Sequence, residues 1–169
     1  MAKRIVSVTS MTPTGTADTT NLVDATYPFL FQGGTSTQRT NILEVYLGGQ
    51  AGASSPTFMQ LARDSTVASG TNSMGSGETD AALDAATAAL AAPVLTGNSN
   101  ATTKPQRSST LHLLNLSFNA FGGIVRWVAA PGEEISIVGN TASLGEISLS
   151  AASGGTPGLL GAHAIYETL

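Results

Sequence analysis

The chain has 169 residues, a size that suits one domain with its own hydrophobic core. Because it has no cysteine, disulfides, zinc–thiolate sites and cysteine nucleophiles are excluded. The net charge of −4 provides no basic surface for a phosphate backbone, so nucleic acid is not an expected partner. The sequence has no run of about 18 apolar residues, the length that a membrane-spanning helix needs. Its start, MAKRIVSV, lacks the apolar segment of a secretion signal.

The composition favours a folded, β-rich domain with long polar loops. Only 11% of residues are charged, whereas glycine, serine and threonine together make up about a third of the chain. The positive mean hydropathy of +0.15 argues against a disordered chain. The low charge has two explanations that the sequence leaves open. Either partner proteins cover part of the surface, or the loops are simply rich in hydroxyl side chains.

The first residues predict an N-terminal arm or edge strand over 1–21. Lys3 to Thr9 has the character of a strand, and a turn-rich stretch follows it. Ala25 to Gln32 is the next apolar segment, but Pro28 restricts it to a sheet edge or a bulge.

The segment Arg39 to Leu47 gives the clearest strand signal of the first half. Apolar and polar residues alternate there with a period of two, which is typical of a strand with one buried face. The inward face would hold Leu43, Val45 and Leu47, and the outward face Glu44 and Tyr46. A further strand is expected over Thr57 to Arg63, with Phe58 and Met59 as core candidates.

A polar and alanine-rich insertion is expected over 64–107. Within it, residues 78–92 (ETDAALDAATAALAA) have a high helix propensity, but their apolar stripe is thin. A short surface helix and a meandering loop both remain open for this segment. On a helix, Asp80 and Asp84 would share a face, although they lack the ligand pattern of a calcium loop.

The second half predicts five more strands. They are expected over Thr110 to Ser117, Ile124 to Ala129, Glu133 to Val138, Glu146 to Ser150 and Ala162 to Thr168. The doublet Leu113-Leu114 breaks the alternation of the first of these, so that strand is either buried on both faces or bulged. The third and fourth, separated by a Gly- and Asn-containing link, look like the two strands of a hairpin.

Eight or nine strands without a repeated strand–helix alternation predict an all-β fold. We expect an antiparallel β-sandwich, and among sandwiches a jelly roll, with a barrel as the competing architecture. Residues 22–169 would form this single domain. Residues 64–107 would be an insertion that extends away from the sandwich.

Residues with catalytic or metal-binding chemistry occur without the spacing that such sites need. His112 and His163 are far apart, whereas a jelly-roll metal site uses two closely spaced histidines and a carboxylate. Glu133 and Glu134 are adjacent in an expected strand and would point to opposite faces. No nucleophile elbow or phosphate-binding loop is present. We therefore expect no enzyme activity, no metal site and no cofactor.

The single tryptophan, Trp127, lies in the expected strand IVRWV. Alternation places Trp127 and Val125 on one face, and Arg126 with Ile124 on the other. Trp127 is expected in the core. The alternative is an aromatic side chain that contacts a partner or stacks on a sugar.

Several segments of the chain resemble a known family. Residues 40–49 (TNILEVYLGG) and 59–66 (MQLARDST) look like the first half of small virion proteins of tailed bacteriophages. Residues 115–134 (NLSFNAFGGIVRWVAAPGEE) and 154–161 (GGTPGLLG) are similar to their second half and end. Such proteins include capsid decoration, or cement, proteins with a jelly-roll fold. The resemblance implies a homotrimer, made in the host cytoplasm, that stabilises the outer virion surface by bridging subunits of the major capsid protein.

If the chain decorates a capsid, its long polar segments are expected to make the contacts. Either residues 1–21 or the insertion at 64–107 would make them, since both segments are long and polar and need a partner to stay ordered. The residues expected at partner contacts are the basic side chains Lys3, Arg4, Arg39 and Arg107.

Two other functions remain as alternatives. A glycan- or receptor-binding jelly-roll module of a phage head fibre or tail fibre predicts exposed aromatic side chains around a groove. A small hydrolase or cupin-like enzyme predicts a bound metal or an acid with a perturbed pKa.

Overall fold

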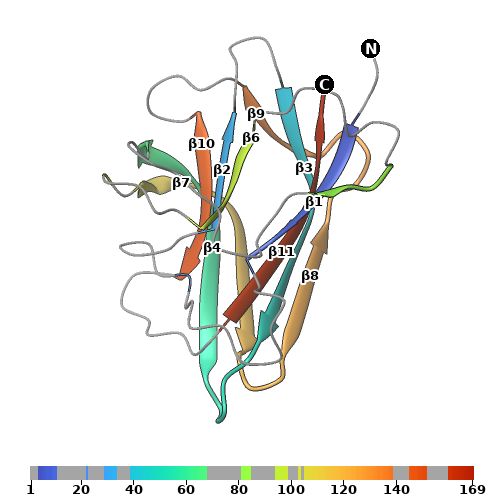
Figure 1. The fold of residues 1–169 in the computed structure, drawn as a ribbon. Helices are drawn as coiled ribbons and strands as arrows, with labels where there is room; N and C mark the ends of the chain where they lie inside the picture. The colour runs from blue at the N-terminus through green and yellow to red at the C-terminus, as the bar shows by residue number, and fades with distance from the viewer. Residues whose placement is uncertain are drawn as a thin grey trace.

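The computed structural model of the chain describes residues 4–10, 22, 29–33, 39–67, 81–84, 94–98, 103, 105–138, 145–151 and 160–169. These residues form eleven strands in two antiparallel sheets, and no helix (Figure 1). The strands are β1 (Arg4–Thr9), β2 (Phe29–Gly33), β3 (Arg39–Gly49), β4 (Pro56–Thr66), β5 (Ala81–Ala82), β6 (Val94–Asn98), β7 (Gln106–Asn119), β8 (Ile124–Val128), β9 (Ile135–Val138), β10 (Glu146–Ala151) and β11 (Leu160–Thr168).

The strand order identifies the sandwich as a jelly roll. Sheet A has the order β5-β1-β11-β3-β8, with β9 also paired to β3, and sheet B has the order β6-β2-β10-β4-β7. Apart from β5 and β6, each early strand pairs with a late one: β1 with β11, β2 with β10, β3 with β8 and β4 with β7. This nesting results when one long antiparallel pair rolls up into two sheets. The expected all-β sandwich is confirmed, and its two separate sheets are not the competing barrel.

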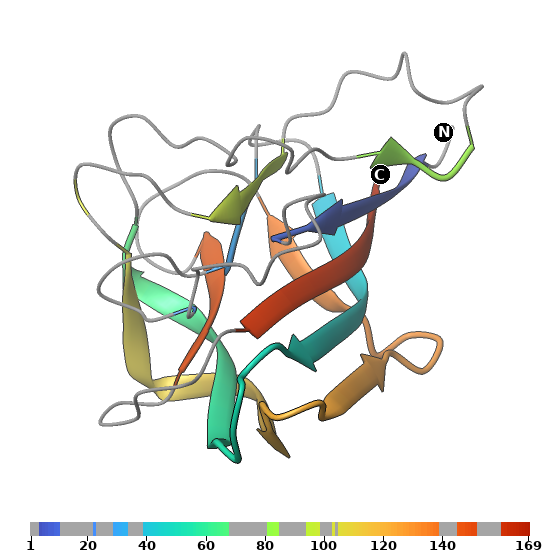
Figure 2. The ribbon, with the colours of Figure 1, turned by 60° about the horizontal axis from the view of Figure 1, so that its bottom comes forward.

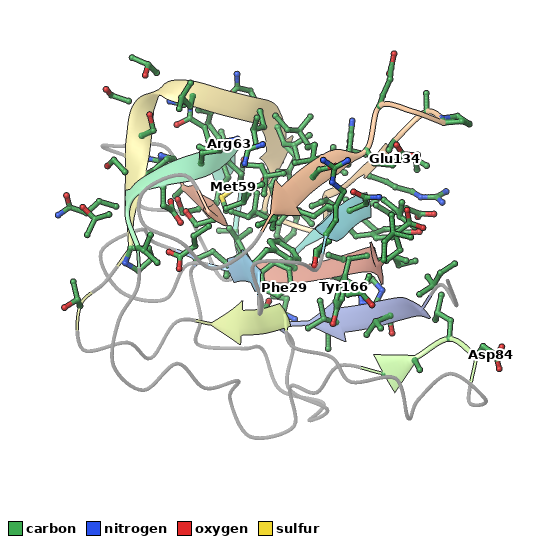
Figure 3. The ribbon with its side chains drawn as sticks, turned by 90° about the horizontal axis from the view of Figure 1, so that it is seen from above. Phe29, Met59, Arg63, Asp84, Glu134 and Tyr166 are labelled. Carbon is green, nitrogen blue, oxygen red and sulfur yellow. The ribbon has the colours of Figure 1, made fainter. Side chains whose placement is uncertain are left out.

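The core lies between the two sheets and follows the two-residue period of the strands. Val45 and Leu47 of β3 are fully buried, as their alternation predicts. Phe29 and Phe31 of β2 meet edge to face, with ring centroids 4.9 Å apart. Among the described residues, Tyr166 of β11 is the largest fully buried side chain, and Figure 3 looks down into the layer that holds it.

Strands β8 and β9 are two halves of one strand that runs along β3. β9 pairs with Arg39–Ile42 of β3, and β8 pairs with Glu44–Gly48. Leu43 lies between these halves at a bulge, where the register of β3 against β11 also shifts. Residues 129–134 leave the sheet between β8 and β9 as the loop at the right of Figure 2.

The expected hairpin between Glu133–Val138 and Glu146–Ser150 is wrong. β9 belongs to sheet A, whereas β10 lies in sheet B between β2 and β4. Ile137 of β9 and Ile147 of β10 are both fully buried, so they reach the core from opposite sheets. Alternating apolar residues occur in both arrangements, and they therefore do not distinguish strands of a hairpin from strands of two facing sheets.

The insertion adds one strand to each sheet. β4 and β7 stay paired as far as Thr66 and Gln106, so the insertion proper comprises residues 67–105. Its strand β5 pairs with β1, and its strand β6 pairs with β2. We call the side with β5 and β6 the insertion side. Figure 2 shows it opposite the side formed by β7 and β8.

A continuous helix over residues 78–92 is wrong at the positions that the structure describes. Ala81 and Ala82 are extended and pair with Ser7 and Val6 of β1. The backbone groups at the edge of β1 override the helix propensity of alanine. Residues 78–80 and 85–92 lie outside the described residues.

Two local expectations for sheet B have different outcomes. The Leu113-Leu114 doublet is a bulge, because Leu114 pairs with Leu61 while His112 pairs with the next residue of β4. Met59 is fully buried as expected, but Phe58 is 44% exposed, so its assignment to the core is wrong. Neighbouring residues of a strand point to opposite faces, and Met59 takes the inward position.

Two turns are bound together at the end of the sandwich that lies at the bottom of Figure 1, which we call the base. One turn joins β3 to β4 and the other joins β7 to β8. The Oδ1 atom of Asn119 accepts hydrogen bonds from the backbone N–H groups of Ser55 and Phe121, at 2.9 and 3.0 Å. Its Nδ2 donates to Ser54 Oγ at 2.9 Å. One side chain therefore holds both turns.

The backbones of these turns also approach each other closely. The N–H of Gly49 donates to the carbonyl oxygen of Gly123 at 2.9 Å, and the N–H of Ala51 donates to that of Ala120 at 3.0 Å. A Cβ atom added at Gly49 would collide with the backbone of Ala120, whereas one added at Gly48 would find open space. Glycine at position 49 is therefore required by this contact.

Gly49→Ala should lower the free energy of unfolding by about 2–3 kcal/mol, because the new methyl group would push the two turns apart. Gly48→Ala is the matched control and should be neutral or slightly stabilising, since alanine reduces the freedom of the unfolded chain. Urea denaturation of both variants gives the comparison. Equal stability of the two variants would contradict the close approach at Gly49.

Candidate functional site

The outer face of sheet A carries a cluster of four side chains from three neighbouring strands. His163 of β11, Tyr46 of β3 and Arg126 of β8 stand side by side, because Tyr46 is the register partner of both others. Glu44 occupies the next outward position of β3. We call these four residues the Tyr46 cluster.

Glu44 is the centre of the polar contacts in the Tyr46 cluster. Its Oε2 atom accepts a hydrogen bond of 2.6 Å from the Tyr46 hydroxyl. The same atom accepts two bonds from Arg126, 2.8 Å from Nη2 and 3.2 Å from Nε. The guanidinium of Arg126 also lies over the Tyr46 ring, 5.1 Å from its centroid. The acid, the base and the phenol therefore hold one another in place.

The charges of the Tyr46 cluster balance at neutral pH. The hydrogen bonds from Tyr46 and Arg126 lower the pKa of Glu44, and the bond to Glu44 raises the pKa of Tyr46. Burial lowers the pKa of His163, an effect that the charge of Glu44 partly opposes. Glu44 is thus negative, Arg126 is positive, and Tyr46 and His163 are uncharged, so the cluster has no net charge.

Next to the cluster, the outer face of sheet A is hollowed. Gly48 of β3 and Gly161 of β11 are register partners, so two adjacent positions have no side chain. The hollow has a volume of about 250 Å³, and it is lined by Tyr46, Leu47, Gly48, Ile124, Gly161 and His163. Its walls are the Tyr46 and His163 rings, whose centroids lie 5.5 Å apart, and the side chain of Ile124. We call this depression the Gly48 hollow.

The chemistry of the Gly48 hollow suits an apolar group. The Tyr46 hydroxyl, which would be the natural donor at its rim, is already bonded to Glu44. The neighbouring ion pair of Arg126 and Glu44 is neutralised within the chain. An entering carbon surface would therefore displace water without separating a charge from its partner.

Of the four basic residues expected at partner contacts, the structure describes three. Arg4 and Arg39 lie at the same end of sheet A, on the two strands that flank β11, and Arg107 lies in sheet B. Lys3 lies outside the described residues, and Arg4 begins β1 opposite Thr168. Arg39 is exposed at the start of β3, at the end of sheet A away from the base. Arg107 of β7 is half-buried, and it donates from Nη1 to Ser150 Oγ at 2.6 Å and to the Ala151 carbonyl at 2.9 Å.

The other residues weighed from the sequence are dispersed. His112 is exposed, with its Nδ1 atom 3.2 Å from Gln60 Nε2. Asp84 follows β5 at one edge of sheet A, whereas Glu134 precedes β9 at the other edge (Figure 3). Among the described residues, no group of three or more metal-ligating side chains converges. Trp127, which was expected in the core, is half-buried and packs against it.

The Tyr46 cluster is the feature that sequence reasoning missed. Alternation correctly places Glu44, Tyr46 and Arg126 on outward faces, where none of them is buried. Their proximity to His163 depends on the pairing of β3 with both β8 and β11, strands that lie far from it in the sequence. The available signal was the glycine pair that ends β3, since glycines in a strand often mark a close approach or an open position.

Comparisons of the chain with known protein families, with curated proteins and with solved structures found no match. The described residues include no helix with the length and apolar character needed to cross a bilayer.

Replacing Glu44 by glutamine should destabilise the fold in a pH-dependent way. The pKa of Glu44 is lower in the folded protein than the usual 4.5, so its charge stabilises the fold above that pH. The advantage of the wild type over Glu44→Gln should be constant near neutral pH and disappear as the pH falls through the lowered pKa. It should be small, because exposed ion pairs contribute little.

Denaturation curves of both proteins between pH 2 and pH 7 test this expectation. Arg126→Gln serves as the second edge of a double-mutant cycle, and its effect should largely vanish in the Glu44→Gln background. Independent, additive effects of the two substitutions would show that the pair does not act as a unit.

Proposed function

We infer that the chain is a structural virion protein of a tailed bacteriophage, without enzyme activity. In this proposal it decorates the outer surface of the capsid as a homo-oligomer, a trimer by resemblance, and stabilises it by bridging subunits of the major capsid protein. The observation that carries the proposal is the insertion side of the jelly roll. There the described strands of one long connection extend both sheets at once, β5 beside β1 and β6 beside β2.

The two segments that the sequence favours for capsid contact meet on this insertion side. The N-terminal strand β1 lies between β11 and β5, and β5 comes from the insertion. The N–H of Leu83, which follows β5, donates to the carbonyl oxygen of Ile5 at 3.0 Å. A surface that combines both segments supports contact with a large partner better than two separate loops would.

Leu83 is the described residue on the insertion side that fits best at such a contact. Its side chain is 59% exposed although it is large and apolar. A leucine that becomes buried at an interface contributes substantially to binding, and repeated attachment to one shell multiplies the effect. Leu83 therefore provides a single side chain at which the proposal can be tested.

Leu83→Asp should lower the occupancy of the protein on capsids at least tenfold at limiting concentration, because the contact would have to bury a charge. The measurement is co-sedimentation with heads of the encoding phage that were assembled without this protein. Leu111→Asp on β7 is the matched control, since Leu111 is an exposed leucine on the opposite side. Its occupancy should equal that of the wild type.

Two results would contradict the proposal in different ways. A wild-type protein that does not bind these heads would remove the decoration function. Loss of binding by Leu111→Asp, with Leu83→Asp unaffected, would move the contact to the β7–β8 side. Thermal unfolding of both variants beforehand ensures that only folded proteins are compared.

A glycan- or receptor-binding module of a head fibre or tail fibre is the second candidate. The observation that favours it is the pair of Tyr46 and His163 rings on an exposed face beside a carboxylate and a guanidinium. Titration of the protein with host surface polysaccharide, followed by the NMR signals of these rings, tests it. Shifts confined to the Tyr46 cluster would support glycan binding, and their absence would remove it.

A further inference from the structure

We propose that Phe121 of one copy of this chain enters the Gly48 hollow of a neighbouring copy. This inference deepens the homo-oligomer part of the proposed function and rests on it. It assigns one named contact to the association between copies. The three observations that carry it are an exposed aromatic side chain on a rigid turn, an apolar hollow of suitable size, and their positions at the same end of the molecule.

Phe121 combines an exposed ring with a backbone that is held in place by hydrogen bonds. Its side chain is 58% exposed, and it lies in the turn between β7 and β8. Its backbone N–H is held by Asn119 Oδ1 at 3.0 Å, and Gly122 follows it with a φ of 68° that favours glycine. The ring therefore stands on a preorganised turn, so little conformational entropy is lost when a partner buries it.

The Gly48 hollow has the size and chemistry to accept a phenyl ring. An apolar cavity of roughly 150 Å³ is enough to bind benzene, and the hollow has a volume of about 250 Å³. Tyr46 and His163 form one wall, where an entering ring can meet aromatic edges. Because Glu44 and Arg126 neutralise each other beside it, no unbalanced charge opposes the entry of an apolar group.

Phe121 does not occupy the hollow of its own chain. It is absent from the residues that line the hollow, and its ring is largely exposed. Ile124 forms a wall of the hollow and is 76% exposed, so the same contact would cover a second large apolar side chain. A neighbouring copy is the occupant that supplies both the ring and the cover without requiring any other component.

The positions of the two features are compatible with a closed ring of copies. The turn that carries Phe121 is bonded to the end of β3 next to the hollow, through the Gly49 N–H and the Gly123 carbonyl oxygen. Two copies related by a two-fold axis can make this contact reciprocally, each Phe121 entering the hollow of the other copy. Other rotations make the contact once per neighbour and can close into a ring. Both patches lie on the β7–β8 side or the base, so the insertion side stays free for the capsid.

The test is the solution mass of the purified protein by size exclusion with light scattering, in the absence of capsids. The wild type should have a mass that is a multiple of the 17.0 kDa protomer, three times that value for a trimer. Phe121→Ser removes the ring, and Gly48→Leu fills the hollow from within, at a position where an added Cβ meets nothing within 4 Å. Each should weaken association at least tenfold and yield the protomer mass at low micromolar concentration.

Matched controls distinguish this contact from general surface effects. Phe58→Ser removes another exposed phenylalanine, 44% exposed on β4 of sheet B, and should leave the mass unchanged. Gly52→Leu adds the same side chain at another glycine with open space, in the β3–β4 turn, and should also leave it unchanged. Circular dichroism and thermal unfolding verify that all four variants are folded.

Three results would overturn the inference. The first is a wild type that remains a monomer up to the highest soluble concentration. The second is a multimer that persists in either Phe121→Ser or Gly48→Leu. The third is dissociation of the control variants to the same extent. Because these measurements need no capsid, failure of the contact and failure of capsid binding are observed separately.

Discussion

The close contact between the β3–β4 turn and the β7–β8 turn fixes the arrangement of the outer face of sheet A. Gly49 can approach the backbone of Ala120 because it has no side chain, and Asn119 then bonds to both turns. This contact sets where β8 begins and therefore its register against β3. A shift of that register by one residue would turn Arg126 inward and Trp127 outward. The contact at the base thus decides which side chains meet on the neighbouring outer face of sheet A.

Everything in the Tyr46 cluster follows from this register. Arg126 is the partner of Tyr46 and therefore reaches Glu44, while Ile124 is the partner of Gly48 and therefore forms a wall of the hollow. The mutual neutralisation of Glu44 and Arg126 keeps the area beside the hollow free of net charge. An apolar depression next to a balanced ion pair is better suited to contact with another protein than to acid–base chemistry, for which a carboxyl with a lowered pKa is a poor proton donor at neutral pH.

The sequence predicts those features that depend on local periodicity. Alternation correctly orients Val45 and Leu47 toward the core and Trp127 to the half-buried face, and the Leu113-Leu114 doublet correctly indicates a bulge. Alternation does not predict which strands pair with each other. The pattern of β9 and β10 is compatible with a hairpin as well as with two facing sheets, and alanine-rich residues become a strand because β1 offers a free edge.

The candidate site could not be predicted from the sequence either, because it depends on which strands pair. Its four residues lie on strands separated by up to 119 positions along the chain, from Glu44 to His163. No spacing rule connects them, because their proximity is a product of the rolled topology rather than of any local motif. What could be foreseen was only that Glu44, Tyr46 and Arg126 face outward.

The topology also separates two kinds of surface on opposite sides of one sandwich. The insertion extends the sheets at β1 and β2. The hollow lies near the base on the outer face of sheet A, lined by residues of β3, β8 and β11, and Phe121 lies in the β7–β8 turn. Under the proposed function, one side would contact the capsid and the other would contact neighbouring copies, so the two contacts would not compete. In a jelly roll the edges of both sheets lie on these two sides. An inserted segment can therefore extend the edges on one side, while the β7–β8 turn joins the edge strands on the other. The proposed contacts on both sides would also give the low charge of the chain, 11% of residues, the explanation that partner proteins cover part of the surface.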